Sequence, residues 1–310
     1  MLMRVFVVAM NAYREAVRAR LLLGLFGLAL ATGAYSLIVA SLSLHQESRV
    51  VSDLGAMFAS LFTAIAAIVV GATSLHREVE QKTIFPILAR PLRRSEYIVG
   101  KYLGTLWVLV TFIAVDAALV LAILAIVSGQ KPAIVAGAAV LLALILGALL
   151  LRAKSTRVFV LLPWAIAALL AMAMLASAAG DDRRLVLAAA ALTLCEAAII
   201  TAVATFFSSF SSPFLTATFS FAVFVIGRSA DTLAHLPKRD VGDFGHMGGV
   251  VLAHLCPNLH LYVPPRPVLL GQVSDMPIWS YVGTSALHAV AYSVTLLVLA
   301  WMFFRKRDFT

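Results

Sequence analysis

Long apolar runs, each able to cross a lipid bilayer as a helix, recur along the whole sequence. We count eight runs of 17 to 26 residues, at 21–44, 54–75, 102–127, 133–151, 158–179, 185–207, 214–230 and 281–304. A hydrocarbon core about 30 Å thick requires about 20 residues of α-helix. Only 13% of the residues are charged, against about 25% in soluble domains. The sequence therefore predicts an all-α polytopic membrane protein, a single bundle of about eight transmembrane helices over residues 1–310.

Residues 1–20 have a different pattern from the runs that follow. Polar side chains recur at helical spacing, with apolar residues between them. This predicts an amphipathic helix in the plane of the lipid headgroups, although a plain extension of the first span is the alternative. The first apolar run has 24 residues, whereas a cleavable signal has a core of about 7–15, so we expect it to remain as an anchor.

The distribution of basic residues predicts the orientation of the chain. If both termini are cytoplasmic, sixteen of the 24 Lys and Arg residues lie inside, which satisfies the positive-inside rule. The other eight lie outside, three of them in the loop 231–280 and a fourth, Arg228, just before it: Arg49, Lys131, Arg183, Arg184, Arg228, Lys238, Arg239 and Arg266. We therefore expect a multi-pass protein of the cytoplasmic (inner) membrane.

The net charge of +9 does not indicate a nucleic-acid partner, because the basic residues flank apolar spans and no recognition module is present. Basic residues at membrane edges are typical of topology signals and of contacts with anionic membrane lipid. Cys195 and Cys256 lie far apart in the sequence and form no disulfide framework.

The segment 76–101 is the most organised loop. Glu78 and Glu80 belong to a short helical piece, after which Pro86 and Pro91 break the chain. A basic cluster surrounds the second proline and consists of Arg90, Arg93 and Arg94. Ser95 can cap the helix that follows. The pattern predicts a docking site for a cytoplasmic partner; the alternative is a solvated charged loop.

This loop resembles the signature of the type-2 ABC exporter permeases, the branch that includes the permease of nitrous-oxide-reductase maturation. The positions that carry the resemblance are Glu78, Glu80, Leu88, Ala89, Arg90, Pro91, Arg93, Arg94, Glu96, Tyr97, Gly100, Lys101 and Gly104. Three other segments are similar to family features: 11–18 to the N-terminal elbow helix, 207–213 to a short inside turn, and 304–308 to the usual ending. Residues 129–180 have no counterpart, which predicts a two-span insertion (133–151 and 158–179) in a six-span core.

The resemblance implies a permease that works as a homodimer or heterodimer with separate ATP-binding subunits. This chain lacks a phosphate-binding Gly-x-x-x-x-Gly-Lys-Ser/Thr loop, so we expect no ATPase activity and no cofactor of its own. ATP and Mg would be held by the partner. A coupling helix bearing Glu78 and Glu80 would dock on that partner, with Arg90, Arg93 and Arg94 contacting its surface or anionic lipid. The spans 54–75 and 214–230 would line the pathway of an unidentified substrate.

Two acidic residues, Asp116 and Glu196, lie inside predicted spans. A charge at this depth costs about 2.5–3.5 kcal/mol even on insertion-based scales. These side chains must face the protein interior, pair with another group, or be protonated. They indicate either a polar lining or gate, or a buried hydrogen bond between helices.

The loop 231–280 contains a weaker candidate for chemistry. His254, Cys256 and His260 could provide soft ligands for copper or zinc, but their spacing matches no strong motif, and ordinary loop residues are the simpler interpretation. The segment 256–259 also resembles an outer-loop Pro-Asn-Leu of the permease family, which favours a structural role.

Two other classes of function compete with the permease subunit. A secondary, ion-coupled transporter would need several intramembrane charges and broken helices in related halves. Inside the spans we find two acids, Asp116 and Glu196, and one proline, Pro163. An intramembrane hydrolase would need a catalytic constellation at bilayer depth, for which His288 with Glu196 is a thin basis. Co-purification with an ATPase would separate these functions.

Overall fold

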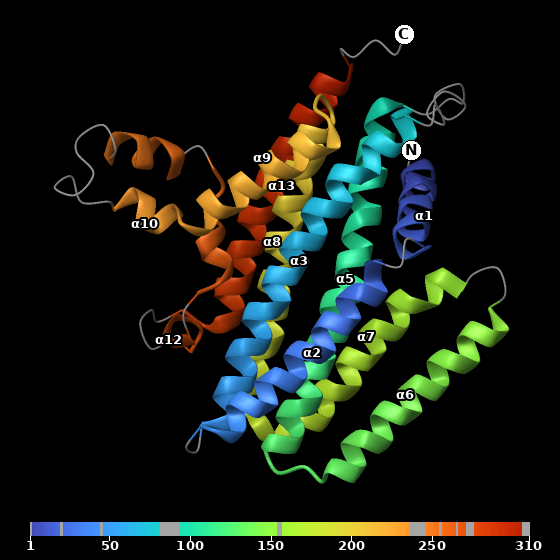
Figure 1. Cartoon of the computed structure of the whole chain (residues 1–310), viewed down its shortest axis with the longest axis vertical. Helices are drawn as coiled ribbons and strands as arrows, with labels where there is room; N and C mark the ends of the chain where they lie inside the picture. Colours follow the sequence, from blue (N-terminus) through green and yellow to red (C-terminus); the bar gives the residue numbers. More distant parts are fainter. Residues whose placement is uncertain are drawn as a thin grey trace.

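The computed structural model contains helices and no strand in the part of the chain that it describes, residues 2–18, 21–43, 46–80, 93–153, 157–235, 246–253, 256–264, 266–270 and 276–305. The long helices run up and down in one elongated bundle (Figure 1). They are α2 (Leu21–Ser41), α3 (Glu47–Glu80), α5 (Arg94–Val127), α6 (Pro132–Arg152), α7 (Arg157–Leu175), α8 (Asp181–Ser208) and α13 (Ile278–Arg305).

Seven helices among the described residues are long and apolar enough to cross a membrane. They correspond to seven of the eight predicted spans, and the helix α7 continues through the 3₁₀ turn η1 (Ala176–Ala179). The eighth, α9 (Pro213–Arg228), has 16 residues. At 1.5 Å per residue it is about 24 Å long, less than the hydrocarbon core. The prediction of a polytopic helical membrane protein is confirmed, but α9 is too short to be counted as a full span.

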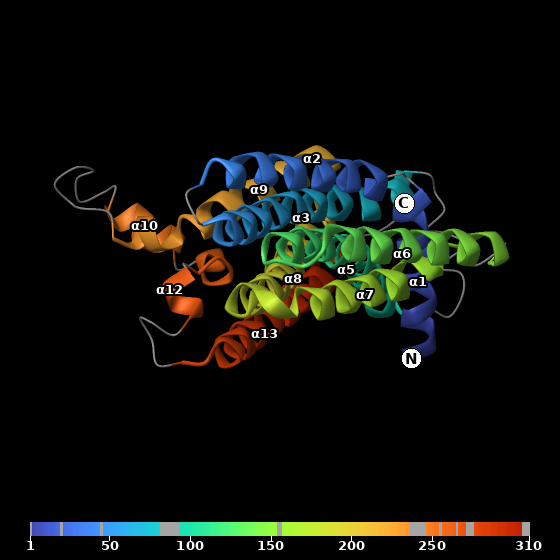
Figure 2. The same ribbon diagram turned by 90° about the horizontal axis from the view of Figure 1, so that it is seen from below.

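The helices α3, α5 and α8 pack against one another and form the centre of the bundle. Seen along the bundle, α2 and α13 lie at opposite edges with these three helices between them (Figure 2). The largest fully buried side chains come mainly from these helices, for example Phe112, Leu121 and Leu192. On α6, in contrast, Val135 is the one buried residue. The helix α6 is therefore apolar and mostly uncovered, and it lies at one edge of the bundle (Figure 1).

The turn from α5 to α6 follows from local sequence. Gly129 has a φ of +97°, which few other residues adopt without strain. Its N–H donates to the carbonyl of Ile126, and the N–H of Gln130 donates to the carbonyl of Ala125. This is the Schellman arrangement that ends many helices, and it directs the chain back along the bundle as α6.

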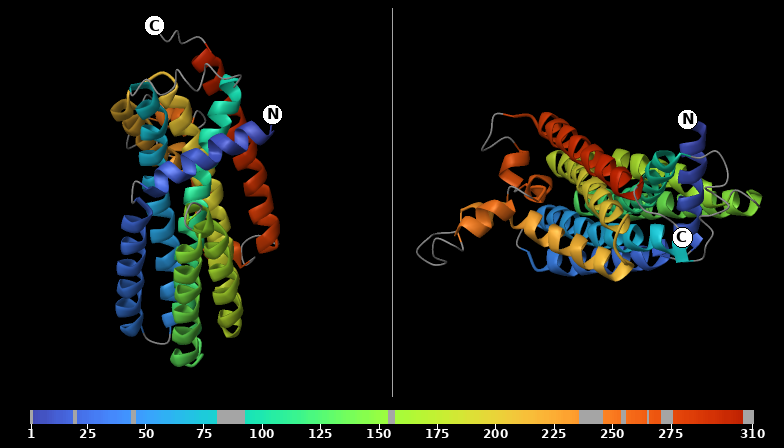
Figure 3. Two further views of the ribbon diagram at one scale, coloured as in Figure 1. Left: turned by 90° about the vertical axis from the view of Figure 1, so that its right-hand side faces the viewer. Right: turned by 90° about the horizontal axis from the view of Figure 1, so that it is seen from above.

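The N-terminal helix α1 (Leu2–Arg18) lies across the long helices, as the left view of Figure 3 shows. It crosses α5 at Gly100 and Gly104, where an added Cβ would come within 2.6 Å of Val8 Cβ and 2.5 Å of the Ala9 carbonyl oxygen. Between the two glycines, buried Lys101 reaches Glu15 of α1 with an Nζ–Oε2 distance of 3.3 Å. The helix predicted over residues 1–20 is therefore present, and it packs against the Gly-Lys-x-x-Gly pattern of α5.

Both chain termini lie at the same end of the bundle (Figure 1), which we call the terminal end. The end of α3, the start of α5 and the turn between α8 and α9 also lie there. The connections from α2 to α3 and from α5 to α6 lie at the opposite end. The described segments next to most of the predicted inside charges thus share one end of the bundle.

Candidate functional site

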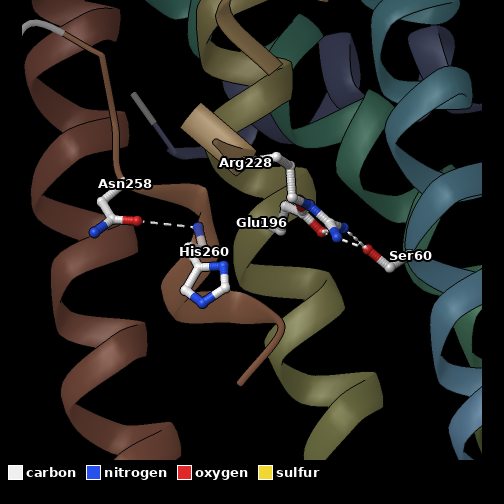
Figure 4. Close-up of polar contacts among 5 residues, drawn as sticks. All are labelled: Ser60, Glu196, Arg228, Asn258 and His260. Atoms are coloured by element: carbon white, nitrogen blue, oxygen red, sulfur yellow. Dashed lines mark hydrogen bonds and ion pairs between the residues drawn. The ribbon is translucent and has the colours of Figure 1, made fainter. Parts of the chain in front are cut away.

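A hydrogen-bonded ion pair lies in the interior of the bundle and joins three helices (Figure 4). Arg228, the last residue of α9, donates from Nε to Glu196 Oε1 at 2.7 Å and from Nη2 to Oε2 at 2.9 Å. Ser60 of α3 donates its hydroxyl hydrogen to the same Oε2 at 2.6 Å and also contacts Arg228 Nη2. We call Ser60, Glu196 and Arg228 the buried triad.

The buried triad lies far from both ends of α8. Glu196 precedes the last residue of that helix by twelve positions and is 1% exposed. At 1.5 Å per residue this places it about 18 Å from the helix end. A bidentate guanidinium fits a carboxylate well, and removing one partner of such a buried pair costs about 3–5 kcal/mol. Of the two roles predicted for Glu196, the structure supports pairing between helices.

The position of Arg228 corrects the sequence interpretation. The sequence prediction places it on the outside, at the end of a complete span 214–230. The helix α9 instead ends beside the middle of α8, and its last residue pairs with Glu196. The guanidinium also lies over the ring of Phe224, 5.4 Å from the centroid. A charge can remain at this depth because a carboxylate and an aromatic face replace its water.

A cavity of about 260 Å³ adjoins the buried triad, on the side that faces away from the terminal end of the bundle. It lies between the first half of α3, the first half of α8 and the short segment η2 (Leu259–Tyr262). Its polar side chains are Ser52, Asp53, Ser60, Thr193 and Tyr262. The Tyr262 hydroxyl hydrogen bonds to His288 Nδ1 at 2.8 Å, and burial raises the pKa of this tyrosine above its usual value. The cavity is therefore mainly apolar with neutral hydroxyls and one carboxylate.

Asp116, the second predicted intramembrane acid, lies apart from the triad. It is 3% exposed on α5, and its Oδ2 has no hydrogen-bond partner among the described residues. A separate cavity of about 10 Å³ adjoins it, and Thr193 lines both this cavity and the larger one. The carboxyl faces the protein interior, as expected, but no partner in the described part of the chain balances a charge on it.

Residues 257–262, which include η2, pack against α9 at this level, and α10 (Ala230–Ala234) follows α9 in the chain. Gly227 allows close contact, since an added Cβ would lie 2.6 Å from the Pro257 carbonyl oxygen. Asn258 accepts a hydrogen bond from the His260 backbone N–H at 3.0 Å (Figure 4) and donates one to Asp231 at 3.1 Å. The structural role expected for residues 256–259 is consistent with this packing.

These contacts do not assemble the weak metal candidate. The His260 ring lies 3.6 Å from the Asp231 carboxylate, whereas His254 is outside the described residues. Within the described residues no group of three or more His, Cys, Asp or Glu side chains could hold a metal ion. Burial raises the pKa of the Cys256 thiol, which makes it a poorer ligand and nucleophile at neutral pH.

The predicted coupling loop is described only at its two edges. Glu78 and Glu80 do not form a separate short helix, because the backbone of α3 remains helical through Glu80. Arg90 and Pro91 lie outside the described residues. The helix α5 begins at Arg94, so Ser95 is not its cap; Glu96 accepts a hydrogen bond from the Arg93 backbone N–H at 3.0 Å.

Arg94 contacts the C-terminal end of α13. Its Nη1 donates to the carbonyl oxygens of Phe304 and Arg305 at 3.1 and 2.7 Å. A cation at this position satisfies carbonyls that have no partner within the helix. Arg94 therefore fastens α5 to α13, a role that was not predicted from the sequence.

Ser60, Thr193, Tyr262 and the pairing of Arg228 were missed. A serine or threonine inside an apolar helix has no local pattern that distinguishes a ligand from a helix-bonded hydroxyl. Arg228 did carry a signal, since the apolar run before it was the shortest of the eight. A short run that ends in an arginine fits a helix that stops inside the bilayer, where its charge must meet an acid.

By the length and composition of its helices, this chain is a multi-span membrane protein. None of the protein-family models to which the sequence was compared matches it. No curated protein matches it either.

Proposed function

We propose that this chain is the membrane-spanning permease subunit of an ABC exporter, driven by ATP that a separate subunit binds and hydrolyses. The observation that carries the proposal is that the described parts of the four segments that resemble the type-2 permeases, although far apart in sequence, meet at the terminal end. The elbow-like helix α1 lies on Gly100 and Gly104. The C-terminal segment contacts the start of α5 through Arg94 and through stacking of Tyr97 on Phe304.

The fourth segment joins the same group of contacts. Phe206 and Phe210, before and within the turn from α8 to α9, both pack on Phe303, with ring centroids 5.7 and 5.4 Å apart. A surface built from the ends of α3, α5, α8 and α13 is suited to transmit the movement of a bound subunit to several helices at once. This supports a docking role for the terminal end; Arg90 and Pro91, which are also predicted to take part, lie outside the described residues.

The buried triad could transmit movement from the docking surface to helices inside the membrane. The predicted lining helices are α3 and α9, and Ser60 and Arg228 connect them through Glu196. Movement of α3 at the docking surface would shift the hydrogen bonds that hold the end of α9. In this scheme the partner, with its ATP and Mg, does the chemistry, and this chain provides the pathway as a homodimer or heterodimer.

The test is to recover the tagged protein from its native membranes and to identify the ATPase that co-purifies with it. Reversing two charges at the docking surface, Glu78→Lys with Glu80→Lys, is expected to weaken recovery of the ATPase or to uncouple hydrolysis from transport. Charge-assisted contacts contribute about 1.5–3 kcal/mol each, so loss of two would lower the affinity by at least about a hundredfold. The matched control is Glu47→Lys, which lies at the other end of the same helix.

Equal recovery, ATPase rate and transport in the double variant would contradict this assignment of the docking surface. One observation favours a second candidate, an ion-coupled secondary transporter. The interior contains Arg228 in addition to Asp116 and Glu196, and ionisable groups at this depth are typical of ion pathways. If no ATPase co-purifies and transport follows an ion gradient without ATP, the second candidate replaces the first.

A further inference from the structure

Asp116 is an acid beside a cavity whose described lining contains no other charged side chain. The 10 Å³ cavity beside it is lined by small and apolar residues of α3, α5 and α8, such as Gly55, Ala59, Ile113 and Val186. Thr193 provides the one other polar side chain in that lining among the described residues. The unpartnered Oδ2 of Asp116 therefore has a hydroxyl and an empty space nearby, and no cation.

The volume of this cavity determines what could fill it. About 10–15 Å³ is the smallest space that holds one water molecule, and such a water needs two or more polar partners. Asp116 and Thr193 are two such partners. A hydrated metal ion or an organic substrate is too large, so the ligands that fit are a single water and a proton on the carboxyl.

The small cavity is separated from the 260 Å³ cavity by a thin wall. Ala56, Ala189 and Thr193 line both cavities. The first two have only methyl side chains, so Thr193 provides the one polar group of this wall among the described residues. The larger cavity has the Asp53 carboxylate in its lining, near the start of α3 at the opposite end of the bundle.

The elements packed against α5 carry other ionisable groups, and none of these lines the small cavity. They include Glu15 of α1, Asp53 of α3, Arg157 of α7, Glu196 of α8 and His288 of α13. Glu196 is already neutralised by Arg228, and Asp53 lies 3.7 Å from the Arg49 Nε. A proton is therefore the counter-charge left for Asp116 among the groups described.

We propose that Asp116 is a proton-binding site that exchanges protons with water in the 260 Å³ cavity through the water-sized cavity beside it. A hydronium ion at the wall transfers its proton to Oδ2 and leaves a neutral water; release is the reverse step. The bound form is a neutral carboxylic acid among α3, α5 and α8, and the released form is a carboxylate at the same place. The proposal does not depend on the function proposed above.

The first test uses dicyclohexylcarbodiimide, a lipid-soluble reagent that adds to protonated carboxyls. In the full-length protein in lipid vesicles at neutral pH, mass spectrometry is expected to find the adduct on Asp116. It is expected to be absent from Asp116→Asn and from Glu196, whose carboxylate is paired with Arg228. Absence of an adduct on Asp116, or an adduct confined to Glu196, would overturn the proposal.

The second test measures access to water. Infrared spectroscopy in D₂O follows exchange of the carboxylic-acid proton, using the band that Asp116→Asn removes. Filling the wall by Ala56→Leu should slow this exchange about tenfold, equivalent to a barrier higher by about 1.4 kcal/mol. The isosteric Thr193→Val should also slow it, and Ala139→Leu on the exposed side of α6 is the matched control. Unchanged exchange in both wall variants would show that protons reach Asp116 by another route and would refute the proposed path.

Discussion

Breaking the buried triad should reveal how much it contributes to holding α9 in place. In Arg228→Met the apolar stem is retained, but Glu196 loses two charged hydrogen bonds of 2.7 and 2.9 Å. The carboxylate is 1% exposed and would keep only the Ser60 hydroxyl. Loss of one partner of a buried pair costs about 3–5 kcal/mol. Because the Arg228 side chain is 27% exposed, we expect a value near the lower limit, about 3 kcal/mol.

The companion variant Glu196→Gln keeps the shape of the site and one carbonyl acceptor, so we expect a smaller loss, about 1–2 kcal/mol. In the double variant neither charge remains buried, and the two losses should not add. The expected coupling energy is about 2 kcal/mol, as found for residues of one hydrogen-bond network, so the double variant should lose about 2–3 kcal/mol rather than the sum of about 4–5 kcal/mol.

The assay is reversible unfolding of the purified protein in mixed micelles, followed by circular dichroism, for the wild type, both single variants and the double variant. Ser60→Ala is a useful fourth variant, with an expected loss of about 1–2 kcal/mol from removal of one hydrogen bond to a charged group. The reasoning fails if Arg228→Met destabilises the protein by less than about 1 kcal/mol, or if the double variant equals the sum of the single ones.

Three further predictions concern other parts of the chain. Gly104→Leu should displace α1 from α5 and expose the N-terminal segment to protease, because the added side chain would collide with the α1 backbone; Gly137→Leu, which faces open space, should have no such effect. A cysteine placed at Lys154 should react with impermeant reagents only from the cytoplasm and one at Asp240 only from outside, and the reverse pattern would refute the proposed orientation. Alkylation of Cys256 should be slow at neutral pH, and its rate should rise at a higher pH than the rate for an ordinary thiol, because burial raises the pKa of Cys256. A rate equal to that of a small free thiol at every pH would contradict this.

The helices themselves could be predicted from the sequence with useful accuracy. The predicted run 133–151 corresponds to α6 (Pro132–Arg152), and 102–127 ends at the last residue of α5. Hydropathy over about 20 residues and the Gly129 turn are local properties, so they need no knowledge of neighbours. The amphipathic pattern of residues 1–20 likewise predicted α1.

The polar interior was decided by the tertiary structure. Nothing local to Arg228 says that it meets Glu196, which is 32 positions away, or Ser60, which is 168 positions away. A charge near the end of an apolar run is equally consistent with an outside loop and with a buried pair. The outcome depends on whether the packed helices bring an acid to the same depth, and that is a property of three helices together.

The two intramembrane acids that the sequence predicted together differ in their pairing, for the same reason. Asp116 and Glu196 have similar apolar neighbours along the chain, yet only Glu196 receives a cation. Helix packing brings the end of α9 to Glu196 and brings only small and apolar residues, with the hydroxyl of Thr193, to Asp116. The amino-acid sequence determined that both carboxyls would lie within the membrane, because hydrophobicity is a sum over one helix. Which of them is paired was decided only by the fold, because electrostatic compensation is a relation between helices.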